Sequence, residues 1–391
     1  MAPPTDLTIL GRTNFRNIRR RFGLKRADRR SHLYVIGKTG TGKSTLLENL
    51  IRQDITAGEG LALLDPHGDL VERLVAASPP SRAHDLVFFD APDEQQRLAF
   101  NPLAGVPHGK RALAASGLLD VFKKLWADSW GPRLEHLLRN ALLALFELPH
   151  ATLADVLRLV ADDAFRRAVG TRLENAQVRT FWLHEYAGYP ERLRAEAIAP
   201  LQNKVGAFLA NPLLYRILTT TRPSLDLRAI MDTGRVLLVN LAKGKLGEDT
   251  AGLLGALLVS SLAAAAFSRA DVPEHRRRDF WVYLDEFQSF TTLSLATMLS
   301  ELRKYRVGMV LAHQYLAQLE EPIRDAILGN AGTVIAFRLG FADAELLAEE
   351  LYPTFATRDL VSLPNYSVYL KLMVDGTPTV PFSAETIAPL S

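Results

Sequence analysis

The segment that most constrains this chain is the glycine-rich run Gly37–Ser44, with the sequence GKTGTGKS. It follows the apolar run Leu33–Ile36 and precedes a helical pattern over Ser44–Ile51. Glycines let a backbone curl so that its N–H groups point at phosphate oxygens, and the N-terminus of the next helix adds partial positive charge. A strand, this loop and a helix in that order predict a phosphate-binding loop for a nucleoside triphosphate. The alternative is a glycine turn without a ligand.

Each residue type in the loop has a predicted task. Lys43 is expected to reach the β- and γ-phosphates and to take part in catalysis, and Ser44 is expected to ligate Mg²⁺. The whole loop is expected to surround the phosphates. The predicted nucleotide-binding residues are Gly37, Lys38, Thr39, Gly40, Thr41, Gly42, Lys43, Ser44 and Thr45.

Composition bounds the class of protein. With 391 residues, 48% of them hydrophobic, the chain can build a large α/β core and a second domain. The absence of cysteine excludes disulfides and thiolate metal sites, and a reducing cytoplasm is expected. Residues Met1–Asp6 lack the apolar core of a signal peptide. Ala251–Phe267 carries no charge, but it is short and rich in Ala, Ser and Gly. We therefore predict a helix buried against a parallel sheet and no direct membrane span.

A formal net charge of +3 hides a basic run between Arg12 and Arg30, where nine Lys and Arg residues face one acidic residue, Asp28. Such a density of charge suits an anionic partner, nucleic acid or nucleotide. A solvated surface is an equally good interpretation, because Phe15 and Phe22 are the only aromatic residues in the run.

Strand-like and helical patterns alternate along most of the chain, as a doubly wound parallel sheet requires. The predicted strands are Leu33–Ile36, Leu61–Leu64, Leu86–Phe89, Val236–Leu241, Phe280–Leu284, Val307–Ala312 and Thr333–Phe337. Between residues 109 and 225 the periodicity is helical with almost no strand. We therefore predict two parts of an α/β core, 1–108 and 226–391, around an inserted all-α domain, 109–225. Alternation around Asp375-Gly376 adds a C-terminal β-hairpin.

A second motif supplies the acidic partner that a phosphate-binding loop needs. The apolar run Phe280–Leu284 is followed by Asp285 and Glu286, which places two carboxylates at the carboxyl end of a buried strand, where ligands of open α/β sheets bind. Asp285 is expected to hold Mg²⁺ and its waters. Glu286 is expected to orient and deprotonate the attacking water. The alternative is a capping pair at a strand end.

Two further residues are candidates for the same chemistry. Gln314 lies just past the apolar strand Val307–Ala312, where it can sense the γ-phosphate or the attacking water; a loop amide is the alternative. Arg303 lies in the basic cluster that ends a helix. It is either an arginine supplied to the nucleotide of a neighbouring subunit or a basic helix terminus favoured by the macrodipole.

Together these motifs resemble the HerA/FtsK superfamily of hexameric DNA-pumping ATPases, in particular the coupling proteins of conjugation and type IV secretion, including their TraG/TraD-like relatives. The resemblance extends from about Leu7 to Pro381, with the motifs in the order of the family. It implies a RecA-like P-loop NTPase core, with the helical insertion at the mouth of a hexamer channel. The segments that carry it are His32–Thr45, Asp65–Leu70, Phe100–Leu103, Tyr283–Gln288, Ala312–Leu319 and Asn330–Leu339.

The resemblance assigns further roles. Arg303 becomes the candidate for an arginine acting in trans, Gln314 for the sensor, Arg338 for a second intersubunit arginine, and Asp65 for an acid near the site. It implies ATP and Mg²⁺ as cofactors, a homohexamer as the assembly, and DNA as the cargo, gripped through its phosphates without sequence readout.

A relaxase, a nuclease or a secretion channel is the kind of protein partner that the resemblance implies. Coupling proteins usually begin with transmembrane helices, which this sequence does not show, so association with the inner membrane is expected to be peripheral and through a partner. The competing function is an ATP-dependent assembly or scaffold NTPase that recruits a protein cargo and moves no DNA. A small-molecule kinase is disfavoured by the adjacent carboxylates Asp285 and Glu286.

Overall fold

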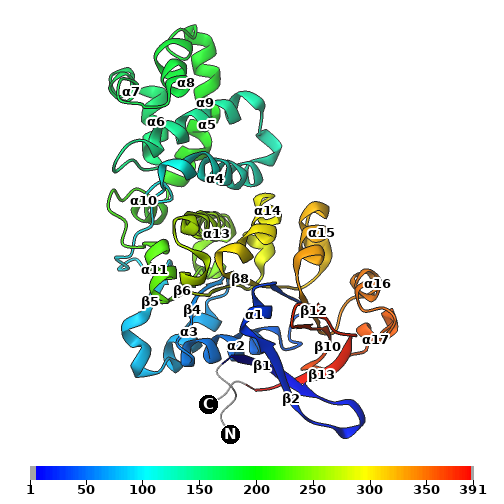
Figure 1. The fold of residues 1–391 in the computed structure, drawn as a ribbon. Coiled ribbons are helices and arrows are strands. Elements are labelled where there is room, and N and C mark those ends of the chain that lie inside the picture. Colours follow the sequence, from blue (N-terminus) through cyan, green and yellow to red (C-terminus); the bar gives the residue numbers. More distant parts are fainter. Residues whose placement is uncertain (1–5, 389–391) are drawn as a thin grey trace. The chain divides into compact units, whose positions relative to one another are not determined.

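The computed structural model describes residues 6–388, and it confirms an α/β protein built on one large, mostly parallel sheet (Figure 1). The eleven strands follow the order β2-β1-β13-β10-β9-β3-β8-β7-β4-β6-β5. The run from β9 to β5 is parallel, and the four strands before it are antiparallel. The parallel strands are β3 (Leu33–Ile36), β4 (Gly60–Asp65), β5 (Leu86–Asp90), β6 (Val236–Asn240), β7 (Phe280–Leu284), β8 (Val307–His313) and β9 (Thr333–Ala336).

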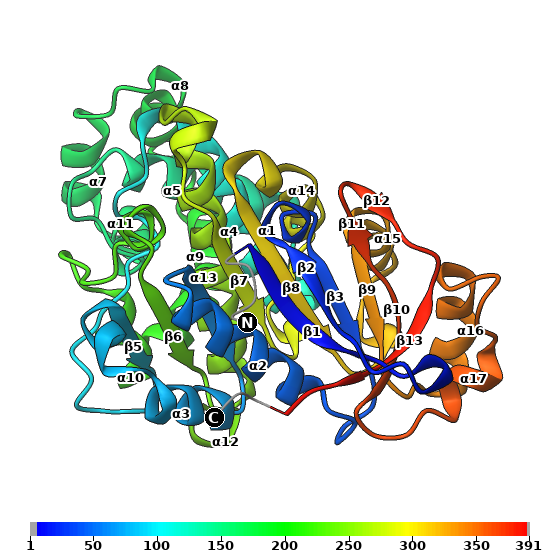
Figure 2. The same cartoon turned by 60° about the horizontal axis from the view of Figure 1, so that its bottom comes forward.

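Continuous apolar sequence explains the middle of this sheet. Every residue of β3, β4, β6, β7 and β8 is buried, as expected for strands covered on both faces. Figure 2 shows β7, β8, β3 and β9 following one another across the sheet. All seven strands that the sequence predicts are present, and β3, which leads into the glycine-rich loop, lies between β8 and β9.

The antiparallel part of the sheet was only partly predicted. It contains β1 (Leu7–Thr13), β2 (Arg21–Lys25), β10 (Ser367–Lys371) and β13 (Phe382–Thr386). β2 lies in the basic run, where charge hides the strand pattern, whereas β1 lies mostly before that run and was not predicted. The C-terminal hairpin is confirmed: β11 (Met373–Val374) pairs with β12 (Thr377–Pro378) across Asp375 and Gly376, whose φ values of 49° and 77° suit a two-residue turn.

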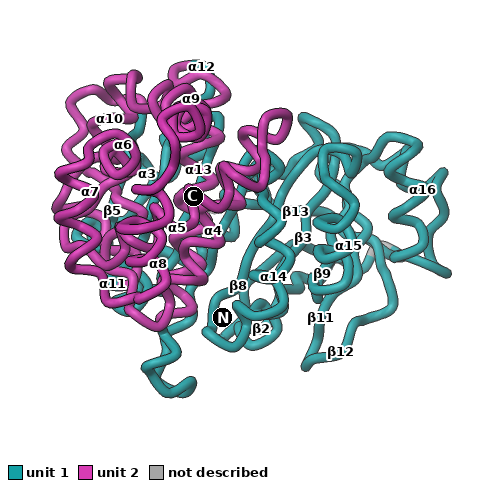
Figure 3. The backbone as a smooth tube through the Cα atoms, turned by 90° about the horizontal axis from the view of Figure 1, so that it is seen from above, with its two compact units in different colours: residues 1–91, 229–244, 269–391 teal, residues 92–228, 245–268 magenta. Residues whose placement is uncertain are grey.

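The described chain forms two compact units, coloured separately in Figure 3. We call residues 1–91, 229–244 and 269–391 the sheet unit, and residues 92–228 and 245–268 the helical unit. The predicted segments 1–108, 109–225 and 226–391 stay a prediction. The helices of the sheet unit are α1 (Arg26–Arg29), α2 (Lys43–Thr56), α3 (Asp69–Ala77), α14 (Ser294–Glu301), α15 (Glu321–Asn330), α16 (Phe341–Glu350) and α17 (Thr357–Val361).

The helical unit contains the helices of residues 109–225, where periodicity predicts helix with almost no strand. Its members are α4 (Arg111–Leu125), α5 (Pro132–Phe146), α6 (Ala154–Ala161), α7 (Asp163–Gly170), α8 (Ala176–Thr180), α9 (Glu191–Leu209), α10 (Pro212–Leu218) and α13 (Glu248–Ser268); α11 (Leu227–Thr233) and α12 (Lys243–Leu246) lie at its boundaries with the sheet unit. The side chains of Asp162, Asn175 and Asn211 accept hydrogen bonds from the first backbone N–H groups of α7, α8 and α10.

Helix α13 is apolar on all sides and packs against α4. A Cβ at Gly117 of α4 would lie 2.6 Å from Oγ of Ser260, so glycine permits the close approach of these helices. Within residues 6–388, Glu248–Asp271 is the one helical stretch long and apolar enough to span a membrane, and 72% of its most apolar window is buried. The prediction that no signal peptide is present concerns Met1–Asp6, of which all but Asp6 lie outside the described residues.

Candidate nucleotide-hydrolysis site

The glycine-rich loop connects β3 to α2, as predicted. Gly40 and Gly42 take φ values of 76° and 120°, which side chains rarely permit. A Cβ at Gly37 would lie only 2.5 Å from Cβ of Phe337, which follows the neighbouring strand β9. Glycine is therefore required at these three positions by conformation or by close packing, and the loop keeps the shape of an anion cradle at the start of α2.

Lys43 points back into the loop. Its Nζ donates to the carbonyl oxygens of Gly37 at 2.6 Å and Lys38 at 3.3 Å. Burial lowers the pKa of its ammonium, while the carboxylates of Glu286 and Asp285 act in the opposite direction. A bound phosphate would be a stronger acceptor for this cation than the two carbonyl groups. The ammonium is thus held at the loop before any ligand arrives.

Asp285 ends up where the sequence predicts, at the carboxyl end of β7 and beside the loop. Ser44 Oγ donates to its Oδ2 at 3.4 Å. Burial, and then the neighbouring carboxylates of Asp65 and Glu286, raise the pKa of Asp285 to about 6. This accumulation of negative charge is what a divalent cation would relieve. The hydroxyl and carboxylate oxygens of Ser44 and Asp285 are hard ligands of the kind that Mg²⁺ prefers, so the residues present fit this ion.

The protein supplies only part of such a coordination shell. Within residues 6–388, no group of three or more His, Asp and Glu side chains is arranged to hold a metal ion. Ser44 and Asp285 would supply one or two ligands of Mg²⁺, and waters and phosphate oxygens would complete its octahedron.

Two side-chain amides hold the carboxylate of Glu286. Its Oε2 accepts from Nε2 of Gln288 at 2.7 Å, and its Oε1 accepts from Nε2 of Gln314 at 2.8 Å. Its backbone φ of 47° is unusual for a residue other than glycine. Oε1 of Gln314 in turn accepts from Oγ1 of Thr39, in the glycine-rich loop. Gln314 therefore links the loop to the carboxylate, and the strained backbone aims Glu286 at this network.

His313 lies one residue before Gln314 and is fully buried. Its Nε2 is 2.5 Å from the hydroxyl oxygen of Tyr34, on the strand that leads to the loop. Burial, and secondarily the charge of Lys43, lower the pKa of His313 to about 3, which keeps the imidazole neutral. We interpret His313 as a structural support of the site.

Arg303 is not brought to the glycine-rich loop of its own chain. It is exposed in the short 3₁₀ turn Leu302–Tyr305, which precedes β8, whereas Gln314 follows β8. The seven residues of this strand separate the two positions by about 20 Å. Any contact of Arg303 with a nucleotide would have to involve another subunit.

Arg338 and Asp65 have intrachain partners. Arg338 donates to the carbonyl oxygen of Leu363 at 3.2 Å and to Oδ1 of Asn365 at 2.9 Å, and its own carbonyl oxygen accepts from the N–H of Lys38. Asp65 accepts from three backbone N–H groups around the start of α3, those of His67, Leu70 and Val71. The first residue braces the loop, and the second caps a helix while adding negative charge near Asp285.

Sequence reasoning missed Tyr366. Its N–H donates to the carbonyl oxygen of Thr41 at 2.8 Å, and a Cβ at Gly42 would lie 2.8 Å from its ring. The residue has a φ of 65° and is 51% exposed, so its ring lies beside the loop and faces solvent. No motif marks this position, and only the fold of the C-terminal strands brings it here.

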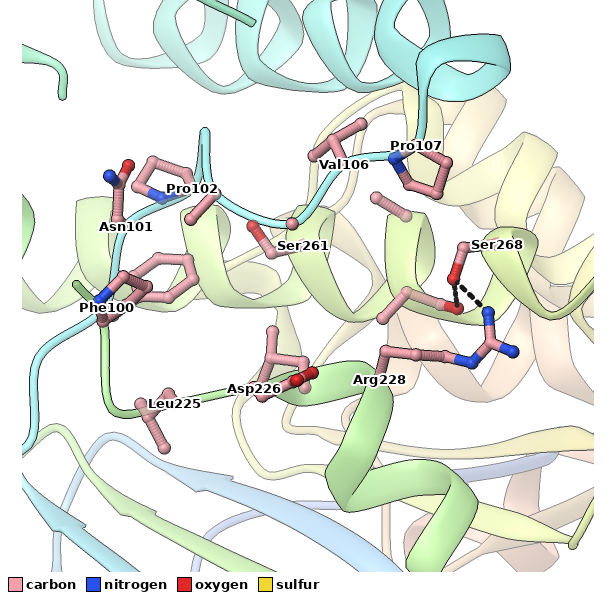
Figure 4. A pocket seen from close by; sticks show the side chains of 16 residues that line it. Phe100, Asn101, Pro102, Val106, Pro107, Leu225, Asp226, Arg228, Ser261 and Ser268 are labelled. Carbon is pink, nitrogen blue, oxygen red and sulfur yellow. Dashed lines mark hydrogen bonds between the residues drawn. The ribbon is translucent and has the colours of Figure 1, made fainter. Parts of the chain in front are cut away.

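A cavity of about 300 Å³ lies elsewhere, inside the helical unit (Figure 4). The loop Phe100–Pro107 and helix α13 form much of its lining, which is mainly apolar. Arg228 donates to Oγ of Ser268 at its edge, at 2.8 Å. It contains none of the predicted site residues.

Comparison with protein families is consistent with this geometry. The family model for the central domain of the helicase HerA matches residues 16–246, more than half of the chain. The model for the TraM recognition site of TraD and TraG matches residues 279–351. No curated protein matches the sequence.

Solved structures of similar fold cover nearly the whole chain. The plasmid coupling protein TrwB in complex with the GTP analogue GDPNP superposes with a TM-score of 0.67 at 15% identity, over 99% of this chain and 90% of that one. TrwB in complex with ADP and Mg²⁺ gives 0.63 at 16% identity, over 97% and 91%. VirB4 of Thermoanaerobacter pseudethanolicus gives 0.67 at 13% identity, over 99% and 97%. At such identities the likeness establishes the fold.

Proposed function

Because the chain belongs to the family of the HerA helicase central domain, we propose that it is an ATPase that moves DNA through a ring of identical subunits. The observation that carries this proposal is the bridge from Thr39 through Gln314 to Glu286, which joins the phosphate-binding loop to the acid that would activate water. The same arrangement leaves Arg303 far from the loop of its own chain.

The proposed ligand is ATP with Mg²⁺. Residues 37–45 would receive the phosphates, with Lys43 exchanging its bonds to loop carbonyls for bonds to phosphate oxygens. Ser44 and Asp285 would hold the metal ion, whose charge offsets that of the phosphates. Two structures of the coupling protein TrwB contain an ATP analogue and ADP with Mg²⁺, which supports this choice.

Glu286 is the proposed general base. Two side-chain amides hold its carboxylate, so one orientation is fixed before water binds. A carboxylate in this state can accept a proton from a water aimed at the γ-phosphate. Gln314 would couple nucleotide binding to the general base. A shift of Thr39 on nucleotide binding would move Gln314, and Gln314 positions Glu286.

The proposed assembly is a hexameric ring. Arg303 would complete a site on the adjacent subunit, since it cannot reach its own. A contact that joins the loop edge of one subunit to a different surface of the next is heterologous, and it closes into a ring by rotation. The proposed segment division, 1–108 and 226–391 around 109–225, places a helical domain on each subunit of this ring.

DNA would be held mainly through its phosphates. Lys243 and Lys245, in α12 just after β6, are basic candidates for a channel lining. A relaxase, nuclease or secretion channel is the proposed protein partner, reached in the cytoplasm or at the inner membrane. The match to the TraM recognition model also favours the second candidate function, an assembly NTPase that recruits a protein cargo.

ATP turnover measured with and without DNA at low salt distinguishes the DNA motor from the assembly NTPase. The motor predicts that single- or double-stranded DNA stimulates turnover in the parent protein, and that Glu286→Gln abolishes turnover while leaving ATP binding intact. Unstimulated turnover that is lost in Glu286→Gln would retain the ATPase and reject the DNA motor. Turnover that survives in Glu286→Gln would reject the site assignment itself.

A further inference from the structure

The basic run Arg12–Arg30 is divided by the fold into two groups with different surroundings. Five of its nine cations form ion pairs within the sheet unit, so their charge is neutralised locally. These pairs are Arg12 with Glu385, Lys25 with Asp375, Arg26 with Glu59, Arg29 with Asp54, and Arg30 with Asp279. This half of the run supports the fold.

The other four cations gather at the connection between β1 and β2. Arg16, Arg19, Arg20 and Arg21 are all exposed, and none forms an ion pair with any carboxylate among residues 6–388. We call this segment, residues 14–21, the hairpin tip. In Figure 1 it is the blue loop that extends away from the other strands of the sheet unit.

Two large apolar side chains are displayed between these arginines. Phe15 is 62% exposed and Ile18 is 52% exposed. The guanidinium of Arg16 lies 5.0 Å from the centre of the Phe15 ring. Exposed apolar groups surrounded by unpaired cations, on a part of the chain that projects from the sheet, mark an interaction site.

The exposed positions of these side chains are fixed by hydrogen bonds within the hairpin. Thr13 closes the tip from one side: its N–H donates to the carbonyl oxygen of Arg20, and its hydroxyl donates to the carbonyl oxygen of Ile18. The N–H of Arg20 donates back to the same hydroxyl at 3.1 Å. Ser383, on the neighbouring strand β13, donates to Oδ1 of Asn14 at 2.7 Å. The tip is therefore fixed at both ends.

We propose that the hairpin tip binds the surface of a membrane that contains anionic lipids. The arginines match lipid phosphates, and Phe15 and Ile18 would enter the boundary between headgroups and acyl chains. Nucleic acid offers phosphates as well, but an aliphatic side chain such as Ile18 enters it only by wedging between stacked bases, which costs unstacking energy, whereas the lipid boundary accepts the side chain without that cost. The contact is peripheral and is independent of the proposed ATPase activity.

Sedimentation of the full chain with vesicles tests the proposal. The parent should bind vesicles of phosphatidylcholine with phosphatidylglycerol at low salt, and pure phosphatidylcholine vesicles far more weakly. Arg19→Gln/Arg20→Gln should weaken this binding about 30-fold, the loss expected for two surface cations. Phe15→Ala/Ile18→Ala should weaken it on the order of tenfold without changing net charge.

Two controls isolate the tip. Arg172→Gln/Arg276→Gln removes the same charge from exposed positions elsewhere and should bind as the parent does. Circular dichroism should show all variants folded. Loss of vesicle binding by the control to the same degree, or no vesicle binding by the parent, overturns the proposal. So does a result in which the tip variants lose affinity for a labelled DNA duplex but keep their affinity for vesicles, since the tip would then be a nucleic-acid surface.

Discussion

Gln314 donates from Nε2 to Oε1 of Glu286 at 2.8 Å, while its amide oxygen accepts from the hydroxyl of Thr39. One side chain thus contacts both the proposed general base and the proposed phosphate-binding loop, although the three residues come from separate parts of the sequence. These two contacts explain why an amide follows β8. The position needs a donor for Glu286 and an acceptor for Thr39, and an amide side chain provides both.

Replacing Gln314 with Leu should lower the rate of ATP turnover at saturating ATP by about 10- to 100-fold, because Glu286 loses one of its two positioning amides. ATP affinity should change little, since Gln314 is not part of residues 37–45. Steady-state kinetics and a binding assay check this. Thr39→Val, which removes only the other half of the bridge, is the matched comparison. A pure loss of affinity in Gln314→Leu would show that the amide binds nucleotide instead of orienting Glu286.

Arg303→Ala should reduce turnover by about 1,000-fold or more in the assembled protein, as expected for an arginine that acts in trans. Lys304→Ala provides the control, because Lys304 is adjacent, also exposed, and paired with Glu301. Mixing Arg303→Ala with Glu286→Gln subunits should restore part of the activity, since some sites would combine an intact acid with an intact arginine. Normal hydrolysis by Arg303→Ala alone would remove the arginine from the proposed mechanism.

Arg29 is a charged residue buried in the interior of the sheet unit. Its guanidinium makes two hydrogen bonds to the Asp54 carboxylate and one to the Tyr283 hydroxyl, and it lies 4.0 Å from the Trp281 ring centre. Arg29→Met should lower the free energy of unfolding by about 3–5 kcal/mol, because Asp54 is left as an unpaired buried charge. Chemical denaturation measures this change.

The double variant Arg29→Met/Asp54→Leu separates charge from packing. It should recover most of the stability, since no charge then remains buried without a partner. If the double variant is as unstable as Arg29→Met, the loss of stability comes from lost packing on Trp281 and not from the broken ion pair.

His32 should make the stability of the sheet unit depend on pH. The N–H of Met309 donates to its Nδ1, so its Nε2–H is the group that meets the carbonyl oxygen of Leu299 at 2.7 Å. Burial lowers the pKa of His32 to about 4, and the nearby charge of Arg303 adds to this. A proton on Nδ1 would point at the N–H of Met309, which is also a donor, so protonation of His32 is unfavourable in the folded protein.

The direction of the effect follows from this lowered pKa. The unfolded chain takes up the proton first, so the stabilisation by neutral His32 is complete above its ordinary pKa and is lost as the pH falls towards 4. Between neutral pH and about pH 5 the parent should lose about 2 kcal/mol more than His32→Asn, which tolerates the left-handed φ of 63° and does not titrate. Urea denaturation at both pH values measures the difference, and equal losses in both proteins would contradict it.

The buried parallel strands were predictable because their sequence is continuously apolar, and Asp375-Gly376 was predictable because its residue types suit a tight turn. Strands β1 and β2 were not. Strand β2 is the charged edge strand of the sheet, and β1 lies between β2 and β13, where Arg12 of β1 is opposite Glu385 of β13. The local sequence of β1 does not indicate that it pairs with β13, near the other end of the sequence.

The site shows the same division. Asp285 and Glu286 could be located from a strand followed by two acids, and the glycine-rich loop from its spacing. The partners of these residues could not, because the contacts of Gln314 with Glu286 and of Tyr366 with the loop join segments far apart in the sequence. Arg338, the candidate for a second intersubunit arginine, has guanidinium hydrogen bonds within its own chain, and its intersubunit role stays a prediction.

Helix α13 has a practical consequence for attempts to take this protein apart. Residues 245–268 belong to the same compact unit as residues 92–228, and α13 is apolar on all sides where it packs against α4. A deletion of residues 92–228 would leave this helix in the chain with its apolar surface exposed to water. Such a surface promotes aggregation. Transplanting the helical unit into another member of the family would require moving two non-contiguous stretches together.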